Sequence, residues 1–131
     1  MSKVTIKNLR FSKPEREWQV RVDRSSVLGN PFHMADESQR DKVCDKYEAY
    51  FNWIIQNTES AFYKEMERLY KLLKKHGKLE LFCWCAPKRC HAETIKKYLE
   101  AKLPIYDLEE LWGEVQDMIE ERRAIEGSYI Y

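Results

Sequence analysis

The chain has 131 residues, which is enough for one domain with a real hydrophobic core. Its 23 Lys and Arg residues nearly balance its 22 Asp and Glu residues, and a net charge of +1 argues against general nucleic-acid binding. No apolar run reaches the roughly 18 residues of a membrane-spanning helix, and the N-terminus lacks the apolar stretch of a signal peptide. Three cysteines crowded between positions 83 and 90 are no disulfide framework. They fit a reducing cytoplasm better, so we expect a cytoplasmic protein without membrane contact.

Two short stretches near the N-terminus alternate apolar and polar residues and predict strands. The first contains Val4 and Ile6, and the second covers residues 18–23, with Arg24 at its end. The pattern leaves open whether the two strands pair as a hairpin or lie apart in one sheet.

The next loop reads Leu28-Gly29-Asn30-Pro31-Phe32. Gly29 permits a backbone turn that other residues resist, and Pro31 pushes Asn30 towards an extended conformation. Two interpretations fit this rigid loop. It presses its backbone against a ligand, or it is only a tight turn with Phe32 as its core anchor.

Two helices are predicted next. Asp36 and Gln39 form a capping box before an apolar stripe over residues 43–55. A second helix runs from a cap near residue 60 to about Gly77, which suits the position just past a helix end. Arg40 is unusual, because cations are disfavoured in a first helical turn. We therefore expect Arg40 to have an anion or a carboxylate as its partner.

The stretch from Leu79 to His91 organises the chain. Leu79 to Cys85 predicts a strand with large apolar groups on both faces, as in an inner strand covered on two sides. Pro87 cannot donate to a ladder, and a helical pattern begins at about His91. Cys90 and His91 therefore lie near a helix N-terminus, where free N–H groups, the helix dipole and the neighbouring positive charges favour an anion. The same field would lower the pKa of Cys90.

Three interpretations of this stretch compete. In the simplest, Cys83 and Cys85 are small apolar core residues and His91 satisfies a helix cap, since free cysteines are among the most buried residues. In the second, the stretch is a zinc site, with four potential ligands in Cys83, Cys85, Cys90 and His91. In the third, Cys90 and His91 contact an anionic ligand or act in catalysis.

The last segment predicts an amphipathic helix. Asp107 and Glu110 form a capping box, and an apolar stripe from Leu108 to Ile119 follows. We expect residues 1–104 to form the main domain. Residues 105–131 then form a helix and tail that pack on the same domain or on a partner, because the stripe is costly to leave in water.

Several of these motifs together resemble the domain-of-unknown-function family 4326, found in bacteria and bacteriophages. The matching positions are Arg24, Leu28-Gly29-Asn30-Pro31-Phe32, Arg40 with Tyr47, Cys83-Trp84-Cys85-Ala86-Pro87 and Cys90-His91. The resemblance covers about residues 18–100. It implies a small α/β, Rossmann-like, three-layer domain with a short, mostly parallel sheet and flanking helices. It implies no reaction.

Loops at the carboxyl ends of parallel strands meet at one edge of a sheet. We therefore expect one pocket for a nucleotide or phosphorylated nucleoside, without a resident cofactor. Its ligand-binding residues would be Arg24, Gly29, Asn30, Arg40, Trp84 and Cys85. Trp84 or Phe32 would stack on a base. In an enzyme, Cys90 or His91 would be nucleophile or general base, with Glu93 as the nearest carboxylate.

Two other functions stay open. One is a non-enzymatic phage protein that sequesters a nucleotide, or that binds a host protein or a second copy of itself through the C-terminal helix. The other is the small zinc module. The ligand, the reaction and the oligomeric state do not follow from the sequence.

Overall fold

The computed structural model describes residues 3–103 and 108–126. The chain divides into two compact units, Met1–Ala101 and Lys102–Tyr131. The candidate site lies entirely in the first unit.

The first unit contains a three-stranded parallel sheet formed by β1 (Val4–Asn8), β2 (Gln19–Arg21) and β3 (Leu79–Cys83). The strand order is β1-β3-β2, so β3 is the central strand and the first two strands lie apart. The expected inner position of β3 is confirmed. Its ladder ends at Cys83, two residues before the predicted end at Cys85.

Three α-helices belong to this unit: α1 (Arg40–Ile54), α2 (Ala61–His76) and α3 (Ala92–Lys102). A short 3-10 turn, η1 (Glu37–Gln39), leads into α1, and Asp36 caps it by accepting a hydrogen bond from Ser38 N. Ser60 caps α2 through Tyr63 N. Gly77 follows α2 with a left-handed φ of 72°, the conformation that favours glycine after a helix end.

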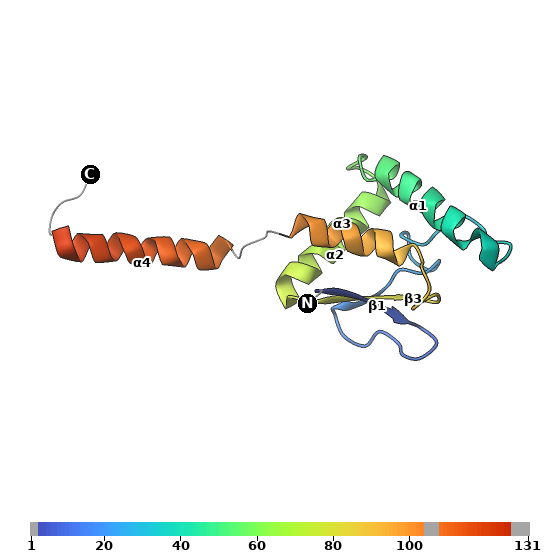
Figure 1. Cartoon of the computed structure of the whole chain (residues 1–131), viewed down its shortest axis with the longest axis horizontal. Helices are drawn as coiled ribbons and strands as arrows, with labels where there is room; N and C mark the ends of the chain where they lie inside the picture. Colours follow the sequence, from blue (N-terminus) through green and yellow to red (C-terminus); the bar gives the residue numbers. More distant parts are fainter. Residues whose placement is uncertain (1–2, 104–107, 127–131) are drawn as a thin grey trace. The chain divides into compact units, whose positions relative to one another are not determined.

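The helices form a single layer against one face of the sheet. Phe51 of α1 contacts both Phe62 of α2 and Tyr98 of α3, with ring centroids 5.3 and 5.2 Å apart. Figure 1 shows the three helices on the same side of the strands. The sheet face that packs against these helices carries five buried residues: Val4, Val20, Leu79, Leu81 and Cys83.

The small α/β class with a short parallel sheet is confirmed, but the helices do not cover both sheet faces. The second face carries mostly polar residues, and among the three strands only Phe82 is buried there. The register places Lys7 and Arg21 on either side of Phe82. Side chains on the same face of neighbouring strands at paired positions lie within reach of each other, and the aliphatic parts of Lys and Arg can cover apolar surface.

The second unit contains α4 (Leu108–Glu126), so the predicted C-terminal helix is present. Asp107, the expected capping residue, lies outside the described residues. Apolar side chains along the helix are exposed, from 38% for Leu111 to 58% for Trp112. Among the described residues, none of the helices is both long and apolar enough to cross a membrane.

Candidate functional site

A cavity of about 320 Å³ opens beyond the carboxyl ends of β2 and β3. Both strands run in the same direction, so the loops that follow them reach the same edge of the sheet. The cavity is lined by polar residues and thiols from these loops and from α1: Asp23, Arg24, Asn30, Arg40, Cys44, Cys85, Cys90 and His91. Its remaining walls are Phe32, Met34, Val43 and Trp84. Of the eight residues expected in the pocket, Gly29 alone is not part of the lining.

Gly29 acts behind the lining by letting two backbone segments approach. A Cβ atom at this position would lie 2.6 Å from both Arg24 Cα and the carbonyl oxygen of Asp23. Its φ is not positive, so the reason for glycine is this contact rather than an unusual turn conformation. The buried Tyr47 hydroxyl donates to the Leu28 carbonyl at 2.7 Å and holds the loop from the other side.

His91 is a buried, neutral residue that ties α3 to the end of β2. Its Nε2 donates a hydrogen bond to the Val22 carbonyl, which places the proton on Nε2 and leaves Nδ1 with the lone pair. Burial lowers the pKa of His91, so the ring is uncharged at pH 7. The Tyr47 ring meets it edge-on at 5.1 Å.

Cys90 does not have the properties of a reactive thiolate. It is buried, with 4% of its surface exposed, and its Sγ lies 3.3 Å from Cys83 Sγ. Hydrogen bonds with Cys83 and Cys85, together with burial, raise the pKa of Cys90. The expectation of a lowered pKa at this helix start is therefore wrong. The neighbouring thiols of Cys83 and Cys85 and burial together affect the pKa of Cys90 more than the helix dipole does.

Cys85 is the thiol that the surroundings activate. It is partly exposed and lines the cavity. Hydrogen bonds from Cys90 and then from Arg40 lower the pKa of Cys85 to about 5, against the opposing effect of burial. The pKa of Cys83 falls to about 7 through its hydrogen bond with Cys90, but no part of Cys83 is exposed. A thiolate at neutral pH is thus most accessible at Cys85.

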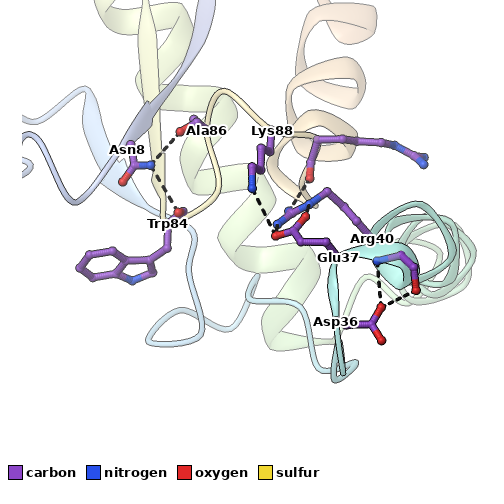
Figure 2. A network of polar contacts seen from close by, with 9 residues as sticks. Asn8, Asp36, Glu37, Arg40, Trp84, Ala86 and Lys88 are labelled. Atoms are coloured by element: carbon purple, nitrogen blue, oxygen red, sulfur yellow. Dashed lines mark hydrogen bonds and ion pairs between the residues drawn. The ribbon is translucent and has the colours of Figure 1, made fainter.

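Arg40 has the carboxylate partner that its place in the first helical turn called for. Its Nε and Nη2 donate to the two carboxylate oxygens of Glu37 at 2.8 and 2.7 Å, and its Nη1 donates to the Arg89 carbonyl. Figure 2 shows Glu37 between Arg40 and Lys88. The hydrogen bond from Arg40 and the weaker one from Lys88 lower the pKa of Glu37 to about 2.

Other charges around the Cys90 loop are paired as well. Arg89 bonds to the carboxylates of Asp41 and Asp45 on α1, and so fastens this loop to the helix. Glu93 accepts a hydrogen bond from the backbone N–H of Cys90 at 3.0 Å, as in a capping box. The start of α3 is therefore already partly satisfied by a carboxylate of its own chain, which weakens it as an anion site.

Arg24 is different from these cations. Its Nη2 donates to the Phe32 carbonyl at 3.1 Å, and no carboxylate lies within ion-pair distance of its guanidinium in residues 3–103 and 108–126. The residue is exposed and lines the cavity. Arg24 can therefore bind an anion without first breaking an existing ion pair.

Two residues of the site escaped the sequence analysis. Asp23 is a buried carboxylate that accepts hydrogen bonds from Arg21, Ser25 and Trp84. Asn8, at the end of β1, donates to the carbonyls of Trp84 and Ala86 and holds the turn after β3 (Figure 2). Asp23 follows a strand and Asn8 ends one, at the edge of the sheet where the cavity lies. This position at a strand end was the feature of the sequence that could have identified them.

The zinc alternative finds no geometric support among the described residues. Nowhere in residues 3–103 and 108–126 do three or more His, Cys, Asp or Glu side chains form a group that could hold a metal ion. His91, one of the four proposed ligands, uses Nε2 for the Val22 carbonyl instead of facing the sulfur cluster with it.

Comparison with known proteins gives one family. No curated protein and no solved structure matches the chain. The sequence model of a domain of unknown function, DUF4326, matches residues 7–101. This span contains all three strands except the first residues of β1, as well as α1, α2, the cavity and nearly all of α3. The chain therefore belongs to the DUF4326 family, with α4 as an addition outside the family domain.

Proposed function

We propose that this domain binds a nucleotide or phosphorylated nucleoside in the cavity between the Gly29-Asn30-Pro31 loop and the start of α3. One observation carries the proposal. The cavity lining contains both the guanidinium of Arg24, which has no carboxylate at ion-pair distance in the described part of the chain, and the indole of Trp84, a residue that is 59% exposed. The first suits a phosphate and the second suits a base.

The size of the cavity agrees with such a ligand. Small-molecule sites usually enclose roughly 300–1,000 Å³, and this cavity lies at the lower end of that range. It therefore favours a ligand of the size of a nucleoside monophosphate over a dinucleotide. Its position, outside the carboxyl ends of parallel strands, is where open α/β sheets bind ligands.

The positive charge of the site is concentrated on one residue. Arg40 is ion-paired with Glu37, and Arg89 is ion-paired with Asp41 and Asp45. The sequence analysis expected both Arg24 and Arg40 to bind the ligand, and we now propose Arg24 alone as the phosphate contact. Arg40 keeps a structural role and a contact with Cys85.

Thermal unfolding with chosen probes tests the proposal. Inorganic phosphate, free nucleosides and nucleoside 5′-monophosphates should be compared at equal concentration. The monophosphates should raise the melting temperature most, because a ligand that binds only the folded state stabilises it by mass action. Arg24→Ala should remove the part of the gain due to phosphate, and Trp84→Ala the part due to the base.

Matched variants control for general destabilisation. Arg68→Ala removes an arginine from α2 that is paired with Glu65, and Trp53→Ala removes another exposed tryptophan, 68% exposed on α1. Both should keep the full ligand effect. Equal gains in wild type and Arg24→Ala would overturn the proposal. So would stoichiometric zinc whose removal by a chelator unfolds the domain.

A further inference from the structure

Three of the four cysteines form one sulfur cluster, in which Cys85 and Cys90 line the cavity and Cys83 contacts Cys90. Cys83 ends β3, Cys85 follows in the next turn, and Cys90 lies just before α3. Cys90 is the shared member. Its Sγ lies 3.3 Å from that of Cys83, and it lines the same cavity as Cys85.

The three thiols differ sharply in access. Cys83 is 0% exposed and Cys90 is 4% exposed, so neither meets solvent directly. Cys85 is partly exposed and lines the cavity. Arg40 lines the same cavity as Cys85, and its positive charge lowers the pKa of Cys85, which favours the thiolate. A small reagent that enters the cavity therefore reaches Cys85 first.

We propose that Cys85 is a peroxide-reactive cysteine and that Cys90 is the thiol that resolves its oxidised form into a disulfide. The co-reactant is a small hydroperoxide such as hydrogen peroxide. The Cys85 thiolate attacks one peroxide oxygen, the S–O bond forms and the O–O bond breaks. The leaving hydroxide takes up a proton and becomes water, and Cys85 is oxidised to a sulfenic acid.

The second step uses the neighbouring thiol. Cys90 sulfur attacks Cys85 sulfur, the S–S bond forms, and the S–O bond breaks. The hydroxyl group leaves with the Cys90 proton as a second water molecule. In total two thiols are oxidised to one disulfide and one peroxide is reduced to two waters. The reaction needs no phosphate ligand, so it stands apart from the proposed function.

Trypsin cleaves after Lys78, Lys88, Arg89 and Lys97, among other sites, so Cys83 and Cys85 share one peptide and Cys90 lies on another. A disulfide to Cys90 therefore links two peptides, and fragmentation of the linked pair shows whether Cys85 or Cys83 carries the bond. The reduced full-length protein, freed of metal by a chelator, is treated with stoichiometric hydrogen peroxide. A dimedone trap and peptide mass spectrometry then report sulfenic acid and disulfide. In the wild type we expect loss of two thiols and a cross-link between Cys85 and Cys90.

Four variants make the assignment falsifiable. Cys90→Ser should stop at a dimedone-trapped sulfenic acid on Cys85. Cys85→Ser should lose no thiol in the same time, whereas Cys83→Ser and Cys44→Ser should still form the Cys85–Cys90 disulfide. First oxidation at Cys44, Cys83 or Cys90 in the wild type would overturn the proposal, and that measurement needs no variant to fold. Unchanged thiol loss in Cys85→Ser, or a first disulfide between Cys83 and Cys90, would do the same.

Discussion

Trp84 Nε1 donates a hydrogen bond to Asp23 Oδ2 at 2.9 Å and thereby joins the residue after β3 to the second residue after β2. The same carboxylate accepts hydrogen bonds from Arg21 and Ser25. One buried group thus fixes the backbone beside Arg24 and the orientation of the indole that lines the cavity.

Replacing Asp23 with Asn should destabilise the domain by about 1–3 kcal/mol at pH 7, because it leaves buried donors with fewer acceptors. The hydrogen bond from Arg21 is the main cause that holds the pKa of Asp23 well below its usual range. A depressed pKa stabilises the folded state above the unfolded-chain pKa of about 4, and this stability is lost as the pH falls. Urea unfolding at several pH values should show the wild-type advantage shrinking below about pH 4.

The control for this change is Asp41→Asn. Asp41 is paired with Arg89, but its side chain is 83% exposed, and exposed ion pairs contribute only about 0–1 kcal/mol. A loss of stability in Asp23→Asn no larger than in Asp41→Asn would show that the buried carboxylate is not a fixing point of the site.

Local patterns predicted most elements of the first unit. Alternation found β1 and β2, a Ser cap and a following Gly bounded α2, and turn residues bounded the stretch before α3. The number of layers could not be predicted in this way. Phe82 and Trp84 suggested two covered faces, but Trp84 lies beyond the strand and Phe82 is flanked by Lys7 and Arg21 of neighbouring strands. Only the pairing register supplies that information.

For the candidate site, the position could be predicted from the sequence but the chemistry of its groups could not. Seven of the eight residues chosen from loop position line one cavity, because parallel strands bring those loops to one edge. The chemistry of each group depended on contacts between distant segments. Cys90 is raised in pKa by Cys83 and Cys85, and Arg40 is ion-paired with Glu37. Spacing along the chain does not show which of these partners are near enough to bond.

Alkylation with iodoacetamide should label Cys85 before the other cysteines. With a pKa of about 5, its labelling rate should change little between about pH 6 and pH 8. Cys44 is buried, and burial raises its pKa, so its rate should rise with pH throughout this range. Peptide mass mapping after short exposures measures each rate.

Arg40→Gln tests the cause of this reactivity. Loss of the guanidinium should move the Cys85 labelling profile to higher pH and lower the rate at pH 6. Arg89→Gln removes a nearby cation that bonds to Asp41 and Asp45 instead, and it should leave the profile in place. Fastest labelling at Cys90, or a Cys85 profile that is the same in both variants, would contradict the assignment.

Removing residues 104–131 should leave the family domain folded. In the described part of the chain, the buried apolar residues all lie between Val4 and Leu99, within the family domain. The melting temperature of the truncated chain should therefore stay close to that of the full chain. Differential scanning calorimetry measures this. Aggregation, or a clear fall in the melting temperature, would show that α4 covers apolar surface of the domain.

Gly29→Ala should disrupt both stability and the cavity. The added Cβ would meet Arg24 Cα and the Asp23 carbonyl oxygen at 2.6 Å, and the Asp23 carbonyl carbon at 2.9 Å. These are backbone atoms, which cannot rotate away as a side chain does, so the loop must move. Such overpacking typically costs about 1–3 kcal/mol. Urea unfolding should show a loss in this range.

The same variant connects the loop to the ligand site. A shifted loop displaces Arg24 and Asn30 together, so any gain in melting temperature from a nucleoside monophosphate should fall along with stability. Gly113→Ala is the matched control, because a Cβ there meets nothing within 4 Å and Ala favours a helix interior over Gly by about 0.5–1 kcal/mol. It should preserve stability and the ligand effect. Equal behaviour of the two alanine variants would mean that the close approach of Gly29 to residues 23 and 24 does not hold the cavity in shape.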